Sequence, residues 1–167
     1  MQCLHHILFQ NTKGVNVITK TYKIPQIRLS YVSDVIAEKP QIKDSDSIAK
    51  VFRYTYEEGE IDYRESFKVA YLNRANKILG INTISTGGTT ATVVVKKIIF
   101  SGALLSNACS IILCHNHPSG TLKPSLQDDN LTRQVVEAGK LLDIKVLDHV
   151  IVTSDGYYSY SDEGRII

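Results

Sequence analysis

The sequence lacks the features that mark membrane-spanning and secreted proteins. It contains no apolar run of about eighteen residues, so it predicts no membrane-spanning helix. Its first residues, MQCLHHILFQNTKG, hold only a short apolar stretch without a small-residue cleavage site, and no secretory signal peptide is expected. Internal repeats and low-complexity tracts are also absent, which argues against a repeat architecture.

Cysteine is scarce, and its spacing excludes a disulfide framework. The three cysteines, Cys3, Cys109 and Cys114, are an odd number at irregular positions, so a reducing cytoplasm is the expected location. Cys114 precedes His115 and invites a role as ligand or nucleophile. Strand alternation would turn it to the opposite face, so we predict a small buried apolar residue instead.

An excess of charge of either sign is missing too. The sequence contains 19 Lys and Arg residues and 17 Asp and Glu residues, which gives a net charge of +2, and it shows no obvious basic cluster. A nucleic-acid-binding module would normally show a basic stripe, so the charge gives little support to such a function. With 167 residues, 43% of them apolar and 22% charged, the chain has the composition of one globular domain.

Hydrophobic periodicity predicts a mixed α/β or α+β fold with a sheet flanked by helices. Residues 1–40 are expected to form an N-terminal extension, partly disordered or with an edge strand at Ile24–Val32, and residues 41–167 the main domain. The predicted elements are a helix from Ser45 or Asp46 to about Glu58-Gly59, a half-buried strand 64–72, its hairpin partner 77–85, a helix 95–107, a buried strand 109–114, a helix 126–142 and strands 145–153 and 157–160. Their predicted inner faces carry Ile48, Val51 and Phe52 in the first helix, Ile98, Ile99, Ala103 and Leu104 in the second, and Leu131, Val135, Ala138, Leu141 and Leu142 in the third.

One motif, HNHPSGTLKPSLQD at residues 115–128, carries the chemistry. His115 and His117 end a buried strand and can point the same way, because side chains on a strand repeat every second residue. Pro118 begins a turn, and Ser125 with Asp128 three residues later forms a predicted capping box at a helix start. The sequence therefore predicts two imidazoles that face one carboxylate.

Two imidazole nitrogens and one carboxylate oxygen form a ligand set typical of catalytic zinc, in which water takes the fourth position. Zinc is preferred to iron or manganese from the ligand types. The bound water, with its pKa lowered to about 7, would need a carboxylate from elsewhere in the fold as proton acceptor. In the alternative interpretation both histidines are ordinary loop residues, and Asp128 merely interacts with the helix dipole.

The run HNHPSG…PS..D, followed by a helix, by LDH and by YYSYSDEG, resembles the RadC family. LNRANKILG and STGGT are similar to the strand-turn-strand region of that family, and the resemblance covers about residues 45–167. The variety it resembles is the short form without a helix-hairpin-helix domain. The resemblance implies a JAB/JAMM (MPN-type) metalloprotease-like fold, with a curved mixed β-sheet between helices in a cytidine-deaminase-type architecture. It also implies one zinc ion per chain, held by His115, His117 and Asp128.

The resemblance also assigns roles that the residues alone leave open. The family uses an upstream glutamate as general acid and base, and Glu65 occupies the matching position. Without the family, Glu57, Glu58 and Glu60 are rival candidates, and the preferred interpretation is that these glutamates are solvated surface residues. Ser125 would cap the helix and donate a hydrogen bond near the oxyanion or the metal-bound water.

Two further segments bear on the site. His149 could orient a metal ligand from outside, but a buried histidine that bonds to backbone is the preferred interpretation, and His149 is left out of the ligand set. Val93-Val94-Val95-Lys96-Lys97 departs from the Asp-Val-Arg or Pro-Arg segments common in the family. Substrate contacts implied for that segment are therefore not carried over.

Three functions follow from these features. The first is a metallopeptidase-type zinc hydrolase that cleaves a peptide or isopeptide bond in an unidentified protein substrate. The second takes up the family's traditional DNA-repair label and gives the chain a nucleic-acid-linked role. The third is a non-catalytic interaction scaffold, against which the complete ligand set argues.

Overall fold

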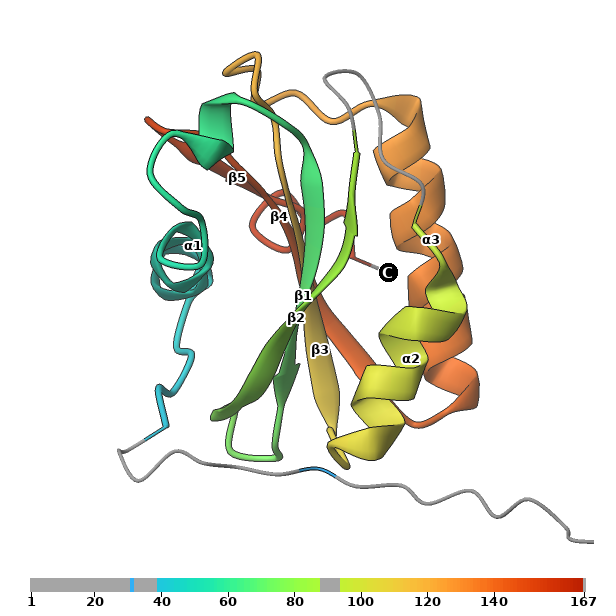
Figure 1. Ribbon diagram of the computed structural model, residues 1–167. Coiled ribbons are helices and arrows are strands. Elements are labelled where there is room, and N and C mark those ends of the chain that lie inside the picture. The colour runs from blue at the N-terminus through green and yellow to red at the C-terminus, as the bar shows by residue number, and fades with distance from the viewer. Residues whose placement is uncertain (1–30, 32–38, 88–93, 167) are drawn as a thin grey trace, which may run out of the picture.

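The computed structural model describes residues 31, 39–87 and 94–166, so the predicted N-terminal disorder and most of the predicted edge strand lie outside the described residues. A five-stranded mixed sheet is covered by α1 on one face and by α2 and α3 on the other (Figure 1). The predicted α+β class, a sheet flanked by helices, is confirmed. In chain order the elements are α1 (Ser45–Arg53), the 3-10 helix η1 (Glu60–Asp62), β1 (Ser66–Leu72), β2 (Ile78–Thr86), α2 (Lys96–Leu105), β3 (Ser110–Asn116), α3 (Leu126–Leu141), β4 (Lys145–Val152) and β5 (Tyr157–Ser159).

The sheet order is β2-β1-β3-β4-β5, which puts β3 at the centre. β1 pairs antiparallel with both β2 and β3, and its register sets Phe67 opposite His115. β3 and β4 run parallel, and α3 makes the crossover between them. The end of β3 that carries His115 is therefore held by a hydrogen-bonded neighbour on each side.

β1 is buried along its whole length, so the prediction of a half-buried strand was wrong. Its alternation of polar and apolar residues suggested a solvent face, but α1 covers that face. Lys68 is only 3% exposed, and its ammonium donates to the Thr55 carbonyl at 2.7 Å and to the Thr55 hydroxyl at 3.0 Å. A long polar side chain thus lies under the segment that follows α1, with its charge hydrogen-bonded.

Helix α1 begins within a residue of its predicted start, because Asp44 caps it and forms a capping box with Ser47. Its inner face, with Ile48 and Phe52 buried, agrees with the prediction. The helix ends at Arg53 rather than near residue 58. Gly59 instead adopts a φ of +75° and opens the short helix η1.

The faces predicted for α2 and α3 were partly wrong. Leu104 is 59% exposed and Leu141 87% exposed, whereas the buried residues of α2 are Ile99, Phe100 and Ala103, and those of α3 are Thr132, Val135, Val136 and Gly139. Near the end of α3, Gly139 lies against the turn that follows the helix, where a Cβ would collide with the carbonyl oxygen of Ile144. Leu131 and Ala138 pack at the edge of the core, as predicted.

Cys114 is fully buried in the apolar cluster under α1, as predicted, and burial raises the pKa of its thiol. Cys109 lies exposed at the other end of β3. Within the part of the chain that the structure describes, no helix has the length and apolar character needed to cross a bilayer.

Candidate functional site

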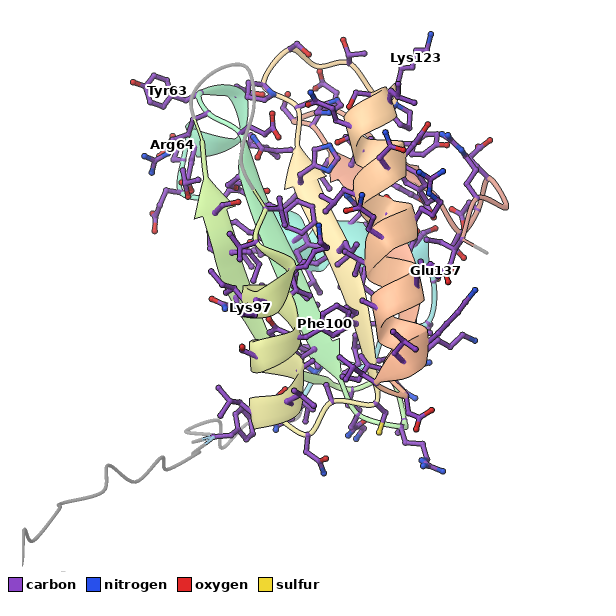
Figure 2. All side chains as sticks on the ribbon, turned by 90° about the vertical axis from the view of Figure 1, so that its right-hand side faces the viewer. Tyr63, Arg64, Lys97, Phe100, Lys123 and Glu137 are labelled. Atoms are coloured by element: carbon purple, nitrogen blue, oxygen red, sulfur yellow. The ribbon has the colours of Figure 1, made fainter. Side chains whose placement is uncertain are left out.

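Two stretches of the chain that are distant in the sequence meet at one end of the sheet. They are the continuous stretch from the end of β3 through the following loop to the start of α3, and the segment between η1 and β1. Figure 2 shows Tyr63 and Arg64 from the last segment and Lys123 from the loop before α3 at this same end. The topology, rather than any local pattern, brings them together.

His115, His117 and Asp128 converge with one ligand atom each. The Nε2 atoms of the two histidines are 2.9 Å apart, the Oδ1 of Asp128 lies 3.3 Å from Nε2 of His115, and its Oδ2 lies 3.9 Å from Nε2 of His117. Tetrahedral zinc with bonds near 2.0 Å separates its ligand atoms by roughly 3.3 Å. The three residues suit a metal ion in spacing and in chemistry, and this group can hold one.

The imidazole of His117 is oriented by a backbone carbonyl. Its Nδ1 lies 2.6 Å from the carbonyl oxygen of Thr121, which can only accept a hydrogen bond, so Nδ1 carries the proton. Nε2 then presents its lone pair to His115 and Asp128. Ligating histidines usually donate their other ring nitrogen in this way.

The carboxylate of Asp128 is oriented by the helix cap. The predicted capping box is present: the Ser125 hydroxyl accepts from the Asp128 amide at 3.2 Å, and Oδ2 of Asp128 accepts from the Ser125 amide at 2.7 Å and from its hydroxyl at 2.6 Å. Oδ1 is thereby left to face His115. Capping by Ser125 is confirmed, whereas its role toward an oxyanion stays a prediction.

Glu65 comes directly before β1, on the side of the ligands. The pairing of Phe67 with His115, continued two residues outward, brings Glu65 beside His117 on the same face. Burial raises the pKa of the Glu65 carboxyl, His117 lowers it, and the nearby Asp128 carboxylate raises it further. The carboxyl group of Glu65 is thus close enough to His117 and Asp128 for both to shift its pKa. Of its rivals, Glu60 instead forms an ion pair with Arg64 at 3.1 Å.

Asn116, between the two histidines, ties the Glu65 segment to the ligand strand. It is fully buried, and its Oδ1 accepts from the Ser66 amide at 2.8 Å and from the Ser66 hydroxyl at 3.3 Å. Its amide nitrogen donates to the carbonyls of Ile61 at 2.7 Å and Arg64 at 2.8 Å. Because these bonds bracket Glu65, Asn116 holds the proposed base in place.

His149 contacts a ligand directly, so the preferred interpretation of a backbone-bonded histidine was wrong. Its Nε2 lies 2.8 Å from Nδ1 of His115, and its Nδ1 lies 2.6 Å from the Thr132 hydroxyl. The pKa of His115 is lowered to about 4, mainly by burial. The Asp128 carboxylate raises this pKa, and His117 lowers it further. Burial also lowers the pKa of His149 well below its usual value. Both rings are therefore neutral at pH 7.

The comparison with known families agrees with this geometry. Residues 42–165 match the family described as RadC-like JAB domain. The chain belongs to the RadC family. This RadC domain therefore joins a JAB-type fold to a His, His, Asp group that can bind a metal ion, and the resemblance noted in the sequence is confirmed.

Relatives of this RadC protein include three named "UPF0758 protein". The relative from Flavobacterium johnsoniae is 44% identical over 106 residues, which are 64% of this chain and 46% of the relative. The relative from Methanosarcina mazei is 37% identical over 133 residues, 80% of this chain and 58% of the relative. The relative from Alkaliphilus metalliredigens is 35% identical over 161 residues, 94% of this chain and 67% of the relative. The chain thus covers less than two thirds of the length of the first two.

Replacing Asn116 by alanine should destabilise this RadC domain by about 3 kcal/mol, because buried groups of Ser66, Ile61 and Arg64 would lose their partner. Urea unfolding of the metal-free protein measures the change. Asn130→Ala is the matched control: that amide only accepts from Arg133 at the surface, so a change below about 0.5 kcal/mol is expected. Equal effects of the two substitutions would contradict the anchoring role.

The stability of metal-free RadC should fall as the pH drops below about 6.5. The unfolded chain then protonates His149 whereas the folded chain does not, so each unit of pH removes up to about 1.4 kcal/mol from the unfolding free energy per buried histidine. Urea unfolding from about pH 7 to about pH 5 measures this slope. His149→Gln should make it shallower, since Glu65 and Asp148, whose pKa values are raised, are common to both proteins and cancel. Parallel slopes would show that His149 titrates normally in the fold.

Sequence reasoning missed Asn116 and Thr132 as parts of this site and set His149 aside. One signal was present: Thr132 follows Asp128 by four residues, one helical turn, and so shares its face. Nothing in the sequence places His149 behind His115, because β4 pairs with β3 only in the folded sheet.

Proposed function

We propose that this RadC domain is a zinc-dependent hydrolase of the metallopeptidase type, which cleaves a peptide or isopeptide bond in a protein substrate. One observation carries the proposal: two imidazole nitrogens and a carboxylate oxygen converge beside a second, half-buried carboxyl group, that of Glu65. When bound, zinc supplies a Lewis acid that polarises a carbonyl group and lowers the pKa of water. Three ligands on the protein suit that use, since a structural zinc site takes four.

The residues of this chain divide the remaining work. Glu65 accepts the proton of the attacking water and returns it to the leaving amine, so one carboxyl serves as base and then as acid. Its raised pKa favours that cycle, because a general acid works best with a pKa closer to the operating pH. Ser125, which caps α3, donates its hydroxyl proton to the developing oxyanion once its bond to Asp128 is released.

The test begins with the metal. Purified, tag-free protein is loaded with zinc, dialysed and measured by plasma mass spectrometry, with about one zinc ion per chain expected. The loaded protein is then incubated with a peptide library and with lysine-linked isopeptides, and the products are identified by mass spectrometry. Cleavage that a chelator stops and zinc restores supports the proposal. One bound zinc without cleavage of either bond type would overturn the hydrolase function and leave the metal site standing.

A further inference from the structure

The ring of His149 is fixed in place behind the ligand His115. The ring is fully buried and stacks on Tyr160, with ring centroids 5.0 Å apart and an angle of 11° between the planes. It also packs edge-to-face with Phe67, at a centroid distance of 5.6 Å. Its two nitrogens point at one partner each, the Thr132 hydroxyl on α3 and the Nδ1 of His115 on β3. A chain of hydrogen bonds therefore crosses from α3 through β4 to β3.

The direction of each hydrogen bond follows from the first donor. The Thr132 hydroxyl donates its only proton to the carbonyl oxygen of Asp128, one turn earlier in α3, at 2.6 Å. Toward His149 that hydroxyl can then only accept, so Nδ1 of His149 carries a proton. A neutral imidazole has one proton, so Nε2 of His149 accepts, and Nδ1 of His115 must donate to it.

We propose that Thr132 and His149 form a relay that fixes His115 in its Nδ1-protonated tautomer and so presents the Nε2 lone pair to the metal. Both are positioning residues, since neither touches the metal or the substrate. The inference rests on the metal site of the proposed function and does not depend on the hydrolysis.

The tautomer of His115 depends on Thr132 as well as on its direct partner His149. His117 bonds to a carbonyl, which can only accept, so its tautomer is set at once. His115 bonds to another imidazole, which can donate or accept with equal ease. With the opposite direction, His149 would donate from Nε2, and His115 would point an N–H instead of a lone pair at Asp128 and His117. Thr132 removes that alternative.

The test uses Thr132→Val, which keeps the shape of the side chain and removes its oxygen, beside Thr132→Ser, which restores the hydroxyl. Two-bond proton-nitrogen NMR spectra of the metal-free protein report which ring nitrogen carries the proton. In wild type, His115 and His149 should both be protonated at Nδ1. In Thr132→Val, His149 would lose the acceptor of its Nδ1 proton, so both rings should switch to the Nε2-protonated tautomer. The spectrum of Thr132→Ser should match wild type, and the His117 tautomer should stay unchanged in all three proteins.

Zinc affinity, measured by competition with a chromophoric chelator, gives the second result. Loss of such an outer hydrogen bond typically costs about 10–100-fold in metal affinity, which is the fall expected for Thr132→Val, with recovery in Thr132→Ser. His149→Gln, whose side-chain carbonyl can still accept from His115, should bind zinc more tightly than His149→Leu. These two variants also test the relay if Thr132→Val fails to fold.

The outcomes separate this inference from the proposed function. Unchanged tautomers and unchanged zinc affinity in Thr132→Val would overturn the relay, while the hydrolase proposal would stand. Tautomers that switch as expected in a protein that binds no zinc would show that Thr132 sets the tautomers, but would overturn the role of the relay toward a metal together with the proposed function.

Discussion

Replacing His117 by alanine should abolish stoichiometric metal binding. The substitution removes one of three protein ligands. Four-ligand structural zinc sites have a binding free energy of about 10–16 kcal/mol, so the loss of one ligand should cost several kcal/mol of binding free energy, on the order of a thousand-fold in affinity. His117 suits this test because it follows β3 and its side chain is 16% exposed, so its removal leaves the core intact. Plasma mass spectrometry after dialysis against zinc measures the stoichiometry.

The matched control is Lys123→Ala, an exposed residue in the same loop before α3 (Figure 2). It should retain about one metal ion per chain, as the wild type should. A His117→Ala protein that keeps one tightly bound metal would show that the ligand set is wrongly assigned. Asp128→Ala would then be expected to retain the metal as well.

Glu65→Gln should keep the metal and lose the hydrolysis. The amide preserves the shape of the side chain but cannot take up a proton, and general acid-base groups contribute about a hundred-fold to ten-thousand-fold to a rate. The turnover of a cleaved peptide or isopeptide, measured beside the metal content, separates the two effects. A fall in turnover with full metal occupancy is the expected result.

Glu60→Gln serves as the control for Glu65→Gln, because Glu60 was a rival from the sequence and pairs with Arg64 on the protein surface. It should hydrolyse at close to the wild-type rate. If Glu65→Gln were fully active, the base would have to lie elsewhere. If Glu60→Gln were the inactive variant, the assignment of Glu65 as the base would be wrong.

Much of the site was predictable because its signals are local. The spacing of His115 and His117 exploits strand periodicity, and Ser125 with Asp128 forms a capping box whose geometry depends on four consecutive residues. That local geometry also turns Oδ1 of Asp128 toward His115. The starts of α1 and α3, which both carry a capping box, were predicted well for the same reason. The buried faces of α2 and α3 were not, because they depend on which side of each helix comes closest to the sheet.

The sequence by itself determined the candidate ligand residues, the cap, the class of fold and, through its resemblance to a family, the glutamate to test. Only the tertiary structure decided that Asn116 ties the Glu65 segment to β3 and that Thr132 and His149 stand behind His115. The physical reason is range. Caps and strand alternation are settled within a few residues, whereas these hydrogen bonds join groups 17 to 55 residues apart, which become neighbours only after β1, β3, β4 and α3 have packed.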